Sequence, residues 1–137
     1  VIRGNCQHGG NYMYGELGHI KMPINVMCSC GQVGCLEAVV RDTLMKNDDI
    51  VDEKILEYLA IGISTVVNMY DPTIVILAGE LVQELNELAN ERLKHLIRSK
   101  ITSERSRELT IKVSELDSLM GVKGVVANVF NQWYPMS

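Results

Sequence analysis

Three of the four cysteines in this chain fall within eight consecutive residues, the segment 28–35 with the sequence CSCGQVGC. His19 stands nine positions before the first of them. One imidazole and three thiolates form a Cys₃His set, in which protein groups occupy all four positions around a tetrahedral zinc ion. Gly31 and Gly34 allow the tight turns that bring the last cysteine back toward the other two. The pattern predicts a structural zinc site with the ligands His19, Cys28, Cys30 and Cys35.

The alternative for these cysteines is a disulfide or a set of buried, unreactive thiols. Cysteines separated by one residue seldom bridge each other, because a disulfide requires a particular separation of their Cβ atoms. Disulfides are also typical of secreted proteins, and no segment of the chain resembles a signal peptide. Free thiols fit a reducing compartment, so we expect a cytoplasmic protein. Cys6 lies apart from the segment and is expected to be a small packed residue of a strand.

The residues around the cysteines also form a longer motif. Residues 15–19 (Gly-Glu-Leu-Gly-His) and 28–37 (Cys-x-Cys-Gly-x-x-Gly-Cys-Leu-Glu) resemble the signature of the ROK family of bacterial sugar kinases and sugar-responsive transcriptional repressors. Residues 70–79 resemble the family's segment of aspartate-proline, buried strand and glycine. Residues 114–127 resemble its closing segment of serine, leucine, glycine and alanine. The resemblance therefore extends over nearly the whole chain.

The resemblance implies a fold class. ROK proteins have an actin-like, ribonuclease-H-like ATPase fold, and this chain would be its second, α/β lobe with a zinc-binding loop. The upstream lobe, with its phosphate loop and catalytic aspartate, has no counterpart in residues 1–137, so we expect a C-terminal ROK lobe. One departure from the family lies between residue 37 and the helix that begins near 52. The family has a longer helical insertion there, which bears on the sugar pocket and on oligomer contacts.

Periodicity and turn residues divide the chain into a β-hairpin over 1–14, a zinc and sugar loop over 15–37, and an α/β core over 38–137. Within the core, the predicted helices are 38–46, 52–69, 80–98 and 118–132, and the predicted strands are 73–77 and 109–113. Asp52 is expected to cap the second helix. The continuous apolar run 73–77 predicts a strand covered on both faces, whereas alternation over 109–113 predicts a half-covered strand.

Length and charge limit the partners. The 137 residues suit one domain or one lobe. The net charge is −4 and no more than two basic residues are adjacent, which argues against direct DNA binding by this segment. DNA would be bound only through an N-terminal domain outside these residues. No apolar run approaches the ~18 residues of a membrane span. Because ROK proteins commonly form dimers or tetramers, a homodimer or higher oligomer is expected.

Glu16, His19 and Glu37 are the candidate sugar-binding residues. An ionised carboxylate accepts hydrogen bonds from two neighbouring hydroxyl groups of a sugar. An imidazole that binds zinc through one nitrogen keeps the other as an N–H donor. In the family that the chain resembles, the matching residues contact sugar hydroxyls, so the expected ligand is a monosaccharide or its phosphate. The alternative for the two glutamates is a surface carboxylate or an acceptor that orients the zinc ligands.

Gly79 and Glu80 are the candidate nucleotide-proximal residues. They follow the predicted strand 73–77 and open a helix, a position where open α/β sheets bind ligands and helix N-termini face phosphates. In ROK kinases the matching turn lies beside the adenine nucleotide. The carboxylate of Glu80 is unfavourable near a phosphate. The alternative is therefore a plain strand-to-helix turn whose acidic residue favours the helix N-terminus.

Three functions are compatible with these residues. The first is a sugar-sensing effector domain of a xylose-repressor-like transcriptional regulator, which binds a hexose-type sugar beside a structural zinc ion. The second is the C-terminal half of an ATP-dependent sugar kinase of the glucokinase or fructokinase kind, which would need ATP and Mg²⁺. The third is a zinc-stabilised interaction module. Phosphoryl transfer needs a catalytic base and metal-bound phosphates, which residues 1–137 do not supply, so we expect this segment alone to be inactive.

Overall fold

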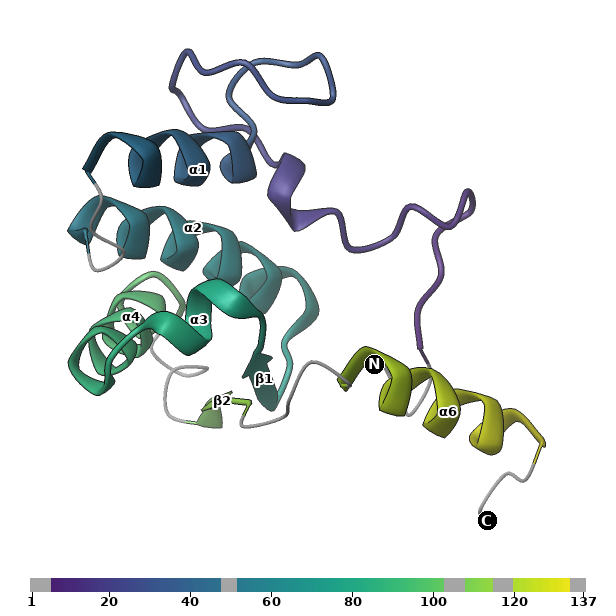
Figure 1. The fold of residues 1–137 in the computed structure, drawn as a ribbon. Coiled ribbons are helices and arrows are strands. Elements are labelled where there is room, and N and C mark those ends of the chain that lie inside the picture. Colours follow the sequence, from purple (N-terminus) through teal and green to yellow (C-terminus); the bar gives the residue numbers. More distant parts are fainter. Residues whose placement is uncertain (1–5, 48–51, 103–107, 115–119, 134–137) are drawn as a thin grey trace. The chain divides into compact units, whose positions relative to one another are not determined.

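The computed structural model describes residues 6–47, 52–102, 108–114 and 120–133. The chain divides into two compact units, Glu16–Ser114 and a second unit made of Val1–Gly15 with Glu115–Ser137. The elements of the first unit are η1 (Leu17–His19), α1 (Leu36–Asn47), α2 (Glu53–Tyr70), β1 (Ile74–Leu77), α3 (Glu80–Glu84), α4 (Glu87–Ser99) and β2 (Thr110–Val113), and the second unit holds α6 (Met120–Trp133) (Figure 1). The predicted α/β class is confirmed by a small parallel sheet whose buried residues Leu77 and Ile111 share a hydrophobic cluster with residues of α2 and α4.

Helix α2 is the centre of the first unit and lies between α1 and α4. It begins as predicted, because the Asp52 side chain accepts a hydrogen bond of 2.7 Å from the Lys54 backbone N–H. It ends at Asp71, whose φ of 49° is left-handed and stops the helical hydrogen bonding. Because both neighbouring helices pack on α2, apolar side chains such as Ile55 and Leu56 are almost fully buried.

Strands β1 and β2 pair in parallel, with Ile74 opposite Thr110 and Leu77 opposite Val113. The half-covered character predicted for β2 is confirmed, since Ile111 is buried and Thr110 is exposed. The prediction that β1 is covered on both faces is wrong for the described residues. Leu77 is buried, but Ile74 and Ile76 are 53% and 64% exposed. A strand is covered on both faces only where a second layer packs on the sheet.

The single helix predicted over 80–98 is two helices, α3 and α4. The break follows from Asn86, whose side-chain oxygen accepts a hydrogen bond of 2.8 Å from the Ala89 backbone N–H. Asparagine is among the best residues for this capping position, so it starts a new helix rather than continuing the old one. Leu88, in the first turn of α4, is 82% exposed, so it lies off the buried face formed by Ala89, Leu93 and Leu96.

The second unit contains α6, which corresponds to the helix predicted over 118–132. Residues 118–119 lie outside the described part. The hairpin predicted over 1–14 falls partly on residues 1–5, which also lie outside it. The described residues 6–14 form no strand, and their backbone makes a turn closed by the Tyr12 N–H and the Gly9 carbonyl oxygen. A two-stranded hairpin without a third strand or a covering helix is only marginally stable.

Helix length and composition also bear on membranes. Among the described residues, no helix combines the length and the apolar content that crossing a bilayer requires.

Candidate metal centre

The loop between η1 and α1 is held closed by backbone pairing, and its Met22 is buried in a hydrophobic cluster with Leu36 of α1. Lys21 pairs with Cys35, and Met27 pairs with Val33, as isolated antiparallel bridges. The turn inside these bridges is closed by the Cys28 N–H, which donates to the Gln32 carbonyl oxygen at 2.8 Å. This pairing brings both ends of the cysteine segment to one place.

Two glycines permit the turns, as predicted. Gly31 and Gly34 have φ values of 82° and 77°, a region that side chains with a Cβ rarely adopt. Gly34 is also sterically required, because a Cβ there would lie 2.5 Å from the Met22 carbonyl oxygen.

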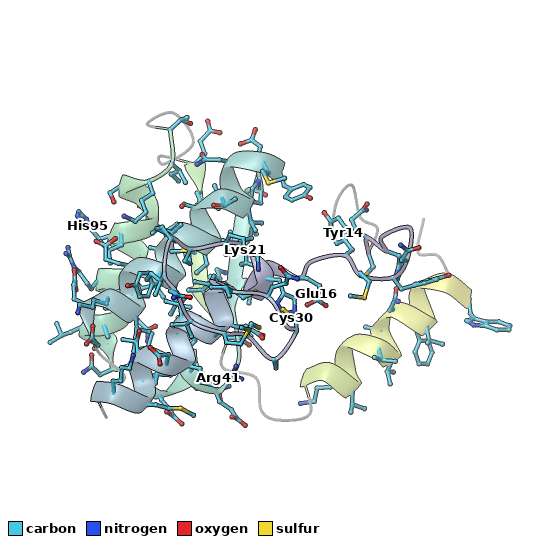
Figure 2. The ribbon with its side chains drawn as sticks, turned by 90° about the horizontal axis from the view of Figure 1, so that it is seen from above. Tyr14, Glu16, Lys21, Cys30, Arg41 and His95 are labelled. Carbon is cyan, nitrogen blue, oxygen red and sulfur yellow. The ribbon has the colours of Figure 1, made fainter. Side chains whose placement is uncertain are left out.

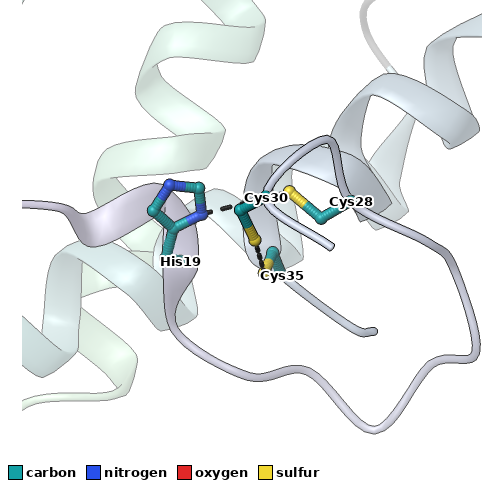
Figure 3. Close-up of side chains that lie close together, drawn as sticks. All are labelled: His19, Cys28, Cys30 and Cys35. Atoms are coloured by element: carbon teal, nitrogen blue, oxygen red, sulfur yellow. Dashed lines mark hydrogen bonds between the residues drawn. The ribbon is translucent and has the colours of Figure 1, made fainter. Parts of the chain in front are cut away.

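The four predicted ligands converge. One ligand atom from each of His19, Cys28, Cys30 and Cys35 lies within 4.8 Å of the others (Figure 3). The sulfur atoms of Cys30 and Cys35 are 3.6 Å apart, and Nδ1 of His19 is 4.0 Å from the Cys28 sulfur. A tetrahedral zinc ion with bonds of about 2.0–2.3 Å separates its ligand atoms by about 3.5–3.8 Å. The donor set and its spacing therefore fit one zinc ion.

The cysteines of the cluster are free thiols. Cys28 and Cys35 are buried and Cys30 is exposed. The 3.6 Å between the sulfurs of Cys30 and Cys35 is far from the roughly 2.05 Å of a disulfide. In the structure, the cluster therefore has the form expected of a metal site rather than that of a disulfide.

The imidazole of His19 has two different neighbours. Nδ1 faces the Cys28 sulfur, whereas Nε2 lies 3.7 Å from Oε2 of Glu16. Metal-binding histidines usually direct their second nitrogen to a carboxylate, a carbonyl group or water. With Nδ1 as the ligand atom, the Nε2 proton of His19 points toward Glu16.

Glu37, in the first turn of α1, lies on the other side of the imidazole. Its Oε1 accepts a hydrogen bond of 3.0 Å from the Cys28 thiol and is 4.0 Å from Nδ1 of His19. The Cys28 hydrogen bond lowers the pKa of Glu37, with smaller contributions from His19 and Arg41. Gly18 leaves room for this carboxylate, because a Cβ there would lie 3.2 Å from the Glu37 Cβ.

Lys21 is a member of this site that the sequence analysis missed. Its ammonium group donates hydrogen bonds of 3.1 Å to the Cys35 sulfur and 3.1 Å to the Val33 carbonyl oxygen. Lys21 and Glu16 come from the same segment of the chain (Figure 2), and the ammonium group of Lys21 contacts Cys35 of the cysteine cluster. The signal available in the sequence was a lone lysine inside a loop rich in thiols.

The turn predicted to lie near a nucleotide is formed by Gly79 and Glu80. Gly79 has φ 115° and directly precedes α3, so its backbone favours glycine, while Glu80 is exposed in the first turn of the helix. A Cβ at Gly79 would meet no described atom within 4 Å. This geometry agrees with a strand-to-helix turn, and proximity to a nucleotide stays a prediction.

Comparisons with known proteins point to one family. The model of the ROK family matches residues 1–49 and 42–131. The two matched segments overlap at residues 42–49 and together span nearly the whole chain.

Individual relatives include both regulators and kinases. A candidate xylose repressor of Caldicellulosiruptor sp. (strain Rt8B.4) is 26% identical over 96% of this chain and 42% of its own length. An N-acetyl-D-glucosamine kinase of Yersinia enterocolitica is 23% identical over 72% of this chain and 45% of its own length. The crystal structure of a ROK hexokinase from Thermus thermophilus covers 95% of the chain with a TM-score of 0.74 at 23% identity, and the chain covers 52% of it. The chain thus spans about half the length of these proteins or less.

Proposed function

Because the chain belongs to the ROK family, we propose that it forms the sugar-binding part of a ROK protein, in which a structural zinc ion organises Glu16, His19 and Glu37. The observation that carries this proposal is the arrangement around one imidazole. Nδ1 of His19 faces the cysteine sulfurs, and carboxylate oxygens of Glu16 and Glu37 lie 3.7 Å and 4.0 Å from its two nitrogens. The expected zinc ligands are His19, Cys28, Cys30 and Cys35.

The chemistry of this arrangement suits a monosaccharide. A sugar presents neighbouring hydroxyl groups, each of which can donate and accept a hydrogen bond. Ionised carboxylates accept such bonds strongly, and glutamate side chains are ordinarily ionised near neutral pH. Zinc bound at Nδ1 of His19 would fix the ring and leave its Nε2–H as a donor. Zinc here would be structural, because protein groups fill its four positions.

For the whole protein, we propose a sugar-sensing transcriptional regulator. The support is that the candidate xylose repressor aligns with 96% of the chain, whereas the N-acetyl-D-glucosamine kinase aligns with 72%. Glu80 is exposed at the start of α3, and if this turn lies beside the nucleotide as the resemblance implies, its negative charge would be unfavourable for phosphate binding. In this role the ligand is a hexose-type sugar, DNA is bound by another domain, and the protein acts as a homodimer or higher oligomer.

The second candidate is the C-terminal half of an ATP-dependent sugar kinase. The kinase relatives and the fold shared with the ROK hexokinase favour it. Under this alternative, the turn at Gly79 and Glu80 lies beside the adenine nucleotide, and the upstream half supplies the base and the Mg²⁺-bound phosphates.

One set of measurements on the full-length protein tests these proposals. Calorimetric titration with glucose, xylose and N-acetyl-D-glucosamine measures sugar binding, and a coupled assay with ATP and Mg²⁺ measures phosphorylation. Saturable sugar binding without ATP turnover is expected of a regulator, whereas turnover of ATP assigns the kinase. Absence of binding to all monosaccharides tested would overturn the sugar site.

The matched variant for this test is Glu16→Ala. It removes a carboxylate near Nε2 of His19 and leaves the predicted zinc ligands in place. Loss of a hydrogen bond to a charged group costs about 1.5–3 kcal/mol, so sugar affinity is expected to fall by about 10- to 150-fold with unchanged zinc content. Loss of zinc with retained sugar binding would contradict this assignment.

A further inference from the structure

We propose that Lys21 is a positioning residue of the metal centre, whose ammonium group holds the Cys35 sulfur and compensates the negative charge of the zinc-loaded cluster. This inference rests on the proposed zinc site. It concerns a residue that is neither a metal ligand nor a predicted sugar contact. Its consequence is that Lys21 controls how firmly the site retains its metal.

The backbone fixes the position of Lys21. Lys21 and Cys35 are partners in an antiparallel bridge, so the two residues lie opposite each other across the loop. From there the ammonium group spans two acceptors, the Cys35 sulfur and the Val33 carbonyl oxygen, each at 3.1 Å. The Lys21 side chain thus links the Cys35 sulfur to the backbone of the loop segment that carries it.

Burial makes this donor important for the sulfur. Cys35 is 0% exposed, so water has no access to its side chain. A buried group that carries negative charge is stable only with hydrogen-bond donors or opposite charges beside it. Zinc supplies one such partner to a Cys35 thiolate, and the ammonium group of Lys21 supplies a second.

The charges around the cluster also favour a cation at this place. A zinc ion bound by three thiolates and a neutral imidazole carries a net charge of about −1. Glu37 and Glu16 add carboxylates within 4.0 Å of the His19 ring nitrogens. Each additional negative charge near the thiolates repels them and makes their ionised form less stable. The ammonium group of Lys21 offsets part of this charge at the sulfur it contacts.

The test compares release of zinc from variants of Lys21. Lys21→Met keeps an unbranched chain and removes the charge and the donors, whereas Lys21→Arg keeps both. Lys54→Met removes another exposed lysine, from the first turn of α2, and serves as the control. The rate of zinc transfer to an excess of a chelating dye is measured for each loaded protein, with circular dichroism as a check of folding.

Lys21→Met is expected to release zinc about tenfold faster, the lower end of the effect of losing a group that contacts a metal ligand. Lys21→Arg is expected to stay within a few-fold of the wild-type rate, and Lys54→Met to match it. The Lys21→Met effect should shrink in high salt, because Lys21 is exposed and its charge is screened. Equal release rates for the wild type and Lys21→Met would overturn the proposal.

A second readout separates contact with the sulfur from simple closure of the loop. In the Co²⁺-loaded protein, the sulfur-to-cobalt charge-transfer absorption reports how readily the thiolates donate electrons, which hydrogen bonds to sulfur reduce. Lys21→Met should move this band to lower energy, and Lys21→Arg should restore it. Faster release with an unmoved band would overturn the role at Cys35. If the wild-type protein takes up neither zinc nor cobalt, the proposed metal site itself fails.

Discussion

The Cys28 thiol donates a hydrogen bond of 3.0 Å to Oε1 of Glu37. Cys28 is a predicted metal ligand and Glu37 is a predicted sugar contact, so the two sites share a direct contact. Glu37 belongs to the first turn of α1, which begins immediately after Cys35. Helix α1, which carries Glu37, therefore begins directly after the last predicted metal ligand. We expect loss of the metal to shift the position of the Glu37 carboxylate.

Replacement of Cys30 by serine is expected to abolish stable zinc binding. Serine keeps the size of the side chain but offers no thiolate, so one of four ligands is lost. Each 1 kcal/mol lost lowers the Tm by about 4 °C in a domain of this size, and we expect a fall of several degrees. Zinc content after dialysis and a thermal melt check this. Cys6→Ser, at an exposed cysteine outside the cluster, should change neither. A Cys30→Ser protein with wild-type zinc content and Tm would refute the assignment.

Two glycines of the loop should respond differently to alanine. Both have positive φ, so either substitution costs about 1–2 kcal/mol of backbone strain. At Gly34 the new Cβ would also lie 2.5 Å from the Met22 carbonyl oxygen, whereas at Gly31 it meets nothing within 4 Å. Gly34→Ala should therefore lower the Tm of the zinc-loaded protein more than Gly31→Ala and should speed zinc release. Equal effects would show that the packing at Gly34 has no influence on the loop.

Gly62 in α2 is expected to be needed for the packing of α1. A Cβ there would lie 2.6 Å from Cδ2 of the buried Leu36, the residue that follows Cys35. Overpacking costs about 1–3 kcal/mol, which equals or outweighs the gain of about 1 kcal/mol in helix propensity, so Gly62→Ala should not stabilise the protein. Gly124→Ala in α6 has open space around the added Cβ and should be neutral or stabilising. Urea denaturation of both variants checks the sign, and a stabilised Gly62→Ala protein would contradict this packing.

The ion pair between Glu53 of α2 and Arg92 of α4 should make stability depend on acid pH. Hydrogen bonding to Arg92 lowers the pKa of Glu53 from its ordinary 4.5. A lowered folded-state pKa contributes stability above about pH 4.5, and this contribution is lost as the pH falls through the folded-state value. Arg92→Met should therefore be less stable than wild type at pH 7, with a difference that closes below pH 4.5.

The comparison for that pair is a double-mutant cycle with Glu53→Gln. Both residues are about half exposed, so a small coupling is expected. On the Glu53→Gln background, Arg92→Met should depend much less on pH between 3 and 7, and the remaining dependence should come from the charge of Glu57. A coupling that persists at pH 3 would assign the effect to packing of the arginine rather than to charge.

Local rules predicted the parts of the structure that depend on neighbours in sequence. Asp52 before an apolar periodic segment predicted the start of α2, and the alternation around Ile111 predicted the half-covered β2. The spacing of His19 and the three cysteines predicted a cluster that the structure brings together. Each of these features depends on the geometry of residues close together in the chain, which can be inferred from their spacing in the sequence.

The missed features depend on competition or on distant contacts. Asn86 could continue a helix or cap a new one. Its side-chain oxygen accepts a hydrogen bond from the Ala89 backbone N–H, and this bond stabilises the cap. The exposure of Ile76 depends on which layer covers the sheet, which a strand's own composition does not state. Lys21 meets Cys35 only after the loop has closed, so no spacing rule identified it.

The most direct test of the central claim is the zinc content of the purified protein, combined with thiol titration before and after chelation. The account predicts one zinc ion per chain, one thiol reactive before chelation, and three more released by the chelator. Retained zinc would establish that His19, Cys28, Cys30 and Cys35 form the centre around which the sugar site is arranged. Absence of zinc with four freely reactive thiols would contradict the metal centre, and the sugar-site roles that depend on His19 would fall with it.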